Sequence, residues 1–147
     1  MSVFLRLSPR SELQEVFEFS ANGKNYYVDK RLKMNFKWAT KNCKKKGGNL
    51  AMDLDQEQWL DIDKVFPIYS GDYYWVGGKA ETVEGIKEWK WLNGNIIEDD
   101  DPSWRDSPFF EGNCLMIHSD HNSDYSKKIC MNDGGCEGKF MFICQLN

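Results

Sequence analysis

The sequence lacks the patterns that mark several large functional classes. It contains no Cys-x-x-Cys pair, which argues against a zinc site built on such pairs. No apolar run approaches the roughly 18 residues of a membrane-spanning helix. There is no P-loop and no Ser-His-Asp order of catalytic residues, so we do not expect an enzyme. A net charge of −4 gives no general reason to expect nucleic-acid binding or membrane insertion.

The sequence is also free of internal repeats and of linker-like segments, which favours one domain. Its 147 residues are enough to bury a core, and its 14% aromatic content is too high for a disordered chain. The first residues are polar and without periodicity. We therefore expect a loose N-terminal leader over 1–16 and a single domain over 17–147.

Cysteine usage indicates an oxidising compartment. Of the five cysteines, four lie between Cys114 and the last residue, which suggests a disulfide framework with one thiol left over. The stretch from Met1 to Leu7 is too short, and too interrupted by Arg6, for the core of a signal peptide. We expect an extracellular, secreted protein whose signal peptide is not part of this sequence. An Asn-x-Ser/Thr glycosylation site is absent.

Local patterns predict a hairpin and then a helix. Apolar and polar residues alternate over 17–28 on either side of Asn22-Gly23, a dipeptide that favours a tight hairpin turn. Asn35 is a suitable N-cap for a helix with apolar residues on one face. That helix is expected to end at Gly47-Gly48.

A second helix, further strands and a long loop are predicted downstream. Asp55 and Gln58 form a capping-box pattern, and Pro67 stops the helix that follows. Apolar segments predict strands at 73–78, 89–91, 113–117 and from 128 to 144. The segment from Glu98 to Gly112 is acidic, contains two prolines and shows no periodicity, and such loops are usually functional.

Seven short motifs occur in an order that resembles the C-type lectin-like domain. They are Tyr26-Tyr27-Val28, Trp38-Ala39 with Cys43, Gly47-Gly48-Asn49-Leu50-Ala51, Trp75-Val76-Gly77, Trp89-Lys90-Trp91 with Gly94, Asn113-Cys114, and Phe142-Ile143-Cys144. The resemblance covers nearly the whole chain. It implies an α+β fold in which two helices flank small antiparallel sheets, with a long irregular loop and two intradomain disulfides.

The resemblance also implies a cysteine pairing. The family joins its first cysteine to its last and the two between them to each other, which gives Cys43–Cys144 and Cys114–Cys136 here. The rival pairing is Cys114–Cys130. In the first arrangement Cys130 is left over, and it is either buried and inert or cross-linked to a second chain in a homo- or heterodimer.

Members of this family hold Ca²⁺ with oxygens from the long loop and from residues just before the next-to-last cysteine. A carboxylate-Pro-amide triplet corresponds to Asp101-Pro102-Ser103, with the proline expected in the cis form. The Asn-Asp pair corresponds to Asn132-Asp133. The implied calcium ligands, which would also bind the carbohydrate, are Asp101, Ser103, Glu111, Asn132 and Asp133.

The sequence departs from the family pattern at this site. Asp101 is shorter than the usual Glu or Gln, Ser103 has no amide N–H for a sugar oxygen, and Met131 replaces the usual Trp. The acidic run starting at Glu98 is equally typical of a solvated loop. Trp104 is a candidate carbohydrate contact, but it also fits an anchor beneath the loop.

Two functional hypotheses follow from this resemblance. The first is a secreted, Ca²⁺-dependent carbohydrate-binding lectin that recognises glycans in innate immunity. The alternative is a Ca²⁺-independent C-type lectin-like module that acts through a protein partner, which the departures at Ser103 and Met131 favour.

Overall fold

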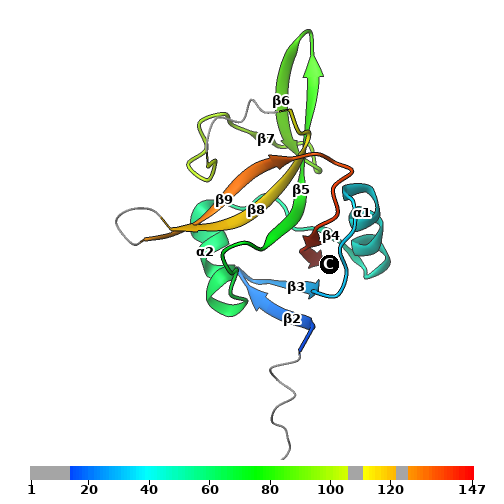
Figure 1. The fold of residues 1–147 in the computed structure, drawn as a ribbon, viewed down its shortest axis with the longest axis vertical. Coiled ribbons are helices and arrows are strands. Elements are labelled where there is room, and N and C mark those ends of the chain that lie inside the picture. Colours follow the sequence, from blue (N-terminus) through cyan, green and yellow to red (C-terminus); the bar gives the residue numbers. More distant parts are fainter. Residues whose placement is uncertain (1–13, 106–110, 122–125) are drawn as a thin grey trace, which may run out of the picture.

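The computed structural model contains two β-sheets and two helices (Figure 1). It describes residues 14–105, 111–121 and 126–147, so most of the expected leader lies outside the described residues. The first strand begins at Val16, one residue before the expected start of the domain. In chain order the elements are β2 (Val16–Ala21), β3 (Lys24–Asp29), α1 (Phe36–Lys45), β4 (Gly48–Leu50), α2 (Gln56–Val65), β5 (Tyr73–Val83), β6 (Ile86–Trp91), β7 (Ile96–Ile97), β8 (Cys114–His121), β9 (Lys127–Gly134), β10 (Met141–Phe142) and β11 (Cys144–Leu146).

The smaller sheet brings together strands that are far apart in the sequence. Its strand order is β2-β3-β11-β4, with β11 antiparallel to both neighbours. The β2–β3 turn consists of Asn22 and Gly23, both at positive φ (56° and 71°), as the hairpin prediction requires. α1 packs beside β4 and β11 (Figure 1).

The larger sheet positions the long loop. Its order is β7-β6-β5-β8-β9, and the short β10 pairs in parallel with β5. The loop that follows β7 leads into β8, and β8 pairs with β9 along its whole length. The β5–β6 hairpin projects from the upper end of the molecule in Figure 1.

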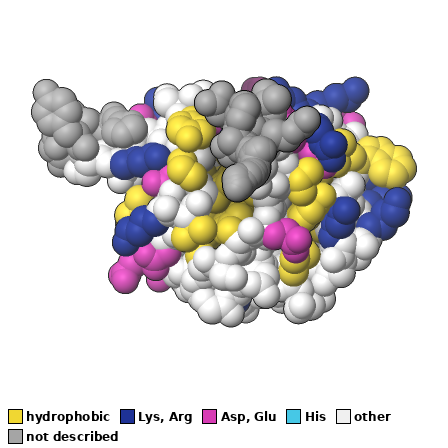
Figure 2. Space-filling view, turned by 90° about the horizontal axis from the view of Figure 1, so that it is seen from below, with side chains coloured by type: hydrophobic (Ala, Val, Ile, Leu, Met, Phe, Trp, Pro, Cys, Tyr) yellow, Lys and Arg dark blue, Asp and Glu magenta, His cyan; other side chains and the backbone are white. Residues whose placement is uncertain are grey.

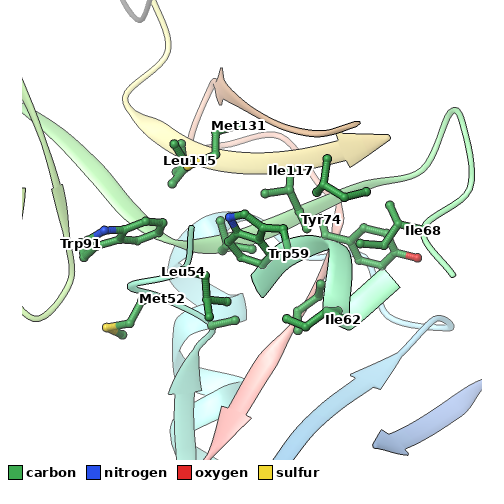
Figure 3. Packing of buried hydrophobic residues seen from close by; sticks show 14 of the residues in the cluster. Met52, Leu54, Trp59, Ile62, Ile68, Tyr74, Trp91, Leu115, Ile117 and Met131 are labelled. Carbon is green, nitrogen blue, oxygen red and sulfur yellow. The ribbon is translucent and has the colours of Figure 1, made fainter. Parts of the chain in front are cut away.

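Both helix starts are capped as predicted. The Asn35 side chain accepts a hydrogen bond from the Trp38 N–H at 3.0 Å. Asp55 and Gln58 form the reciprocal capping box of α2. α2 covers β2 and the start of β9, and it places Trp59 in the core between the two sheets (Figure 3). Burying such side chains stabilises the fold by roughly 1.5–3 kcal/mol each.

The two disulfides follow the pairing that the family resemblance implies. Cys43–Cys144 joins α1 to β11, and Cys114–Cys136 joins β8 to the turn after β9. The rival Cys114–Cys130 pairing is therefore wrong. Cys130 lies on β9 outside both disulfides and is 1% exposed. A disulfide to a second chain would require this part of the sheet to open, so the burial does not support the predicted intermolecular cross-link.

Candidate functional site

The three segments predicted to hold calcium meet along the second half of β9. The Met131 N–H donates to the Ser103 carbonyl at 2.7 Å, which fixes the Asp101–Ser103 turn beside the strand. The Gly112 N–H donates to Asp133 Oδ2 at 2.8 Å, which fixes the residues next to Glu111 on the other side. The Asp101–Ser103 turn and Gly112 are thus both held against β9.

The side chain of Ser103 points into the protein. It is 0% exposed, and its Oγ accepts a hydrogen bond from the Gln56 side-chain amide at 3.1 Å. The peptide bond before Pro102 is trans, as are the other peptide bonds of the described residues, so the expected cis proline is wrong. In this conformation the Ser103 hydroxyl is not presented to a surface ion or sugar.

Gln56, at the start of α2, sets this orientation of the Ser103 side chain. Gln56 was not among the residues predicted from the sequence. Its amide nitrogen also donates to the Ile129 carbonyl at 2.6 Å, and its amide oxygen accepts from the Ile129 N–H at 3.0 Å. One side chain thus joins α2, β9 and the Asp101–Ser103 turn. A glutamine in the first turn of a helix carries no sequence signal for such a role.

Three of the proposed ligands already accept a backbone hydrogen bond with a side-chain oxygen. Asp101 Oδ1 accepts from the Ser103 N–H at 2.8 Å. Asn132 Oδ1 accepts from the Asp133 N–H at 2.9 Å, in addition to the bond between Asp133 and Gly112. Across 14–105, 111–121 and 126–147, no three His, Cys, Asp or Glu side chains are close enough to hold a metal ion. Ca²⁺ requires six to eight oxygens around one point, and the residues as arranged do not fit it.

A lysine brings positive charge to the same place. Lys87 on β6 donates from its ammonium group to the Gly112 carbonyl at 2.7 Å. Gly112 is the neighbour of the proposed ligand Glu111. Repulsion from this ammonium adds to the cost of bringing a divalent cation to the site.

Trp104 anchors the loop from below. It is 7% exposed, its indole N–H donates to the Glu98 carbonyl at 2.9 Å, and its ring meets Trp89 edge-on at 5.3 Å. The assignment of Trp104 to a sugar-binding surface is therefore not supported, because the ring is not accessible for stacking.

A groove of about 540 Å³ runs beside this site, between β6, β7 and the start of the loop. Ile86 and Ile96 line it and are 66% and 63% exposed. Its charged lining is mostly acidic and consists of Glu88, Glu98, Asp99 and Asp100 with one lysine, Lys87. The groove thus combines exposed aliphatic surface with a cluster of negative charge, which is typical of a docking surface rather than of a core edge.

The sequence pattern and the fold now identify the family. Residues 32–146 match the Lectin C-type domain. The chain belongs to the C-type lectin domain family. Domains of this family are generally non-enzymatic binding modules, so the expectation that the chain is not an enzyme is confirmed. They are also typically extracellular, and in the described part of this chain no helix is long and apolar enough to cross a membrane.

Solved C-type lectin domains share the fold at low sequence identity. The domain of murine dendritic cell inhibitory receptor 2, in complex with an N-glycan, has a TM-score of 0.67 and 16% identity, with 91% of this chain and 97% of that chain covered. A Ca²⁺-dependent type II antifreeze protein, in its Ca²⁺-free form, has a TM-score of 0.62 and 18% identity over 88% of this chain and 97% of that one.

A second antifreeze protein of this fold is described as calcium-independent. It has a TM-score of 0.60 and 23% identity, with 90% of this chain and 95% of that chain covered. These likenesses show the fold and leave the ligand open, since the same fold carries glycan-bound, Ca²⁺-dependent and Ca²⁺-independent proteins. A comparison with curated protein sequences finds no match.

Proposed function

We propose that this C-type lectin domain is an extracellular, protein-binding module that works without Ca²⁺. The observation that carries the proposal is the inward position of Ser103, which is buried and hydrogen-bonded to Gln56. A calcium ligand in its place would have to break that bond and expose the Gln56 amide. The internal hydrogen bonds of Asp101 and Asp133 support the same reading.

The groove beside β6 and β7 supplies the binding surface of this proposal. Ile86 and Ile96 provide apolar contact area, and the mostly acidic lining provides charge complementarity. The chemistry fits a protein surface in which an apolar side chain is flanked by lysine or arginine. The two disulfides agree with an extracellular location, because such bonds persist in oxidising compartments.

Calorimetric titration of Ca²⁺ into chelator-stripped protein tests the first half of the proposal. We expect no saturable heat and no thermal shift with excess Ca²⁺. Saturable binding at millimolar or better affinity would overturn Ca²⁺ independence.

Selection from a displayed peptide library, with chelator present, tests the second half. We expect enriched sequences with an apolar residue next to basic ones, and we expect Ile96→Asp to abolish their binding. Val65→Asp is the matched control, because Val65 is 53% exposed on α2, outside the groove lining. Equal loss in both variants, or no enrichment, would contradict the proposal.

Ca²⁺-dependent carbohydrate recognition in innate immunity is the second candidate. One observation favours it: the Asp101–Ser103 turn and Gly112 are both hydrogen-bonded to β9, at Met131 and at Asp133. The ligands would be Asp101, Ser103, Glu111, Asn132 and Asp133. In that case Asp133→Ala abolishes glycan-array signals that depend on Ca²⁺, whereas an array blank with both Ca²⁺ and chelator excludes this candidate.

A further inference from the structure

Positive charge is concentrated in one stretch of a chain that is acidic overall. From Lys30 to Met52 the sequence contains eight lysine and arginine residues and no aspartate or glutamate, although the whole chain has a net charge of −4. α1 lies in the middle of this stretch. Figure 2, which looks from below Figure 1, shows lysine and arginine side chains around exposed hydrophobic ones at the edge where α1 lies.

The lysines of α1 are arranged on one face without acidic partners. Lys37, Lys41 and Lys44 are spaced four and three residues apart, so they form a single stripe along the helix. In the described ranges none of the three takes part in an ion pair. Like charges at this spacing repel each other, and Lys37 also opposes the helix dipole at the first turn.

This stripe forms one wall of a cleft. The cleft has a volume of about 510 Å³, and Lys79 from β5 brings a fourth ammonium group to it. Its floor is apolar and contains Phe36, Leu92 and the Cys114–Cys136 disulfide. Glu137 is the one acidic residue in the lining. Four ammonium groups facing a single carboxylate leave the cleft strongly positive.

An exposed indole flanks the cleft. Trp38 is 56% exposed, whereas each of the other five tryptophans is at most 7% exposed. The ammonium group of Lys41 lies 4.8 Å from the centre of its ring. An exposed ring next to a cationic stripe offers an apolar surface for the face of a sugar and a charge for an acidic substituent on the same ligand.

We propose that the α1 cleft binds a sulfated polysaccharide. Sulfate groups would pair with Lys37, Lys41, Lys44 and Lys79, and the sugar rings would pack over the apolar floor and against Trp38. A polysaccharide is favoured over a nucleic acid because the disulfides place the chain outside the cell. The cleft shares no lining residue with the groove at β6 and β7, so the chain would hold two ligands at separate sites.

The test measures binding of a fluorescent heparin oligosaccharide, with chelator present so that calcium-dependent binding does not contribute. We expect the double variant Lys41→Gln/Lys44→Gln to bind roughly tenfold more weakly, because it removes two of the four ammonium groups that line the cleft. The matched control is Lys24→Gln/Lys64→Gln, which removes the same charge from β3 and α2 outside the cleft and should leave affinity unchanged. Affinity should also fall as salt is raised.

Two further variants distinguish binding at the cleft from a general effect of net charge. Glu137→Gln should tighten binding two- to threefold, because it removes the carboxylate from the lining. Trp38→Ala should weaken the oligosaccharide but not inorganic sulfate. No binding by the wild type, equal losses in both double variants, or tighter binding of single-stranded DNA than of heparin would each overturn the proposal. The peptide selection at the other groove is unaffected by these outcomes, so the two proposals fail separately.

Discussion

Gly112 shows how closely the loop is packed on β9. A Cβ at this position would lie 2.5 Å from the Gly134 carbonyl carbon and 2.8 Å from Asp133 Oδ2. Gly112→Ala should therefore lower the free energy of unfolding by about 1–3 kcal/mol, as other overpacking substitutions do. Urea denaturation measures this change in the free energy of unfolding. Gly135→Ala is the control, because nothing lies within 4 Å of its Cβ, and a similar loss there would show that the close approach is not the cause.

His118 makes stability depend on pH. It is 6% exposed on β8 against the ring of Tyr73, and burial lowers the pKa of its imidazole below the usual 6.5. Unfolding then takes up a proton at mildly acidic pH, so the stabilisation is complete above about pH 6.5 and is lost as the pH falls towards the folded pKa. Urea denaturation at pH 7.5 and 5.5 should show this loss. His118→Gln should reduce the loss of unfolding free energy between these two pH values. An unchanged loss in the variant would contradict the role given to His118.

Among the elements, α2 has the widest influence on the site, through the side chain of Gln56. Gln56→Ala should cost about 1–3 kcal/mol, because it leaves the Ile129 backbone groups and the Ser103 hydroxyl without this partner. Exposed Glu57, one residue on, is the control, and its replacement by alanine should cost less than about 1 kcal/mol. Denaturation curves give both values. Hydrogen exchange at the Ile129 amide should quicken only in the Gln56 variant.

Features decided within a single element are the ones that can be predicted from the sequence. Asn22-Gly23, the cap at Asn35 and the capping box at Asp55 were predicted because each is decided by residues a few positions apart. The inward direction of the Ser103 side chain was not predicted, because it depends on Gln56, which lies 47 residues upstream. The family resemblance gave the wrong expectation for Pro102, whose preceding peptide bond is trans.

At the scale of the whole molecule, the two disulfides should differ in their contribution. Cys43–Cys144 spans 101 residues and Cys114–Cys136 spans 22. By loop entropy, removing the first should cost about 4–5 kcal/mol and removing the second about 3 kcal/mol. Paired Cys→Ala variants, compared by denaturation under oxidising conditions, test this order. A larger loss from the shorter loop would show that native contacts, not chain entropy, determine the difference.

The position of β11 between β3 and β4 bears on how the protein is made. During synthesis the β2–β3 hairpin and α1 emerge about a hundred residues before Cys144 does. Until then the inner edges of β3 and β4 have no strand between them, and Cys43 has no disulfide partner. The smaller sheet thus stays incomplete while the roughly one hundred residues between Cys43 and Cys144 are made. The smaller sheet can therefore close only after β11 has been synthesised.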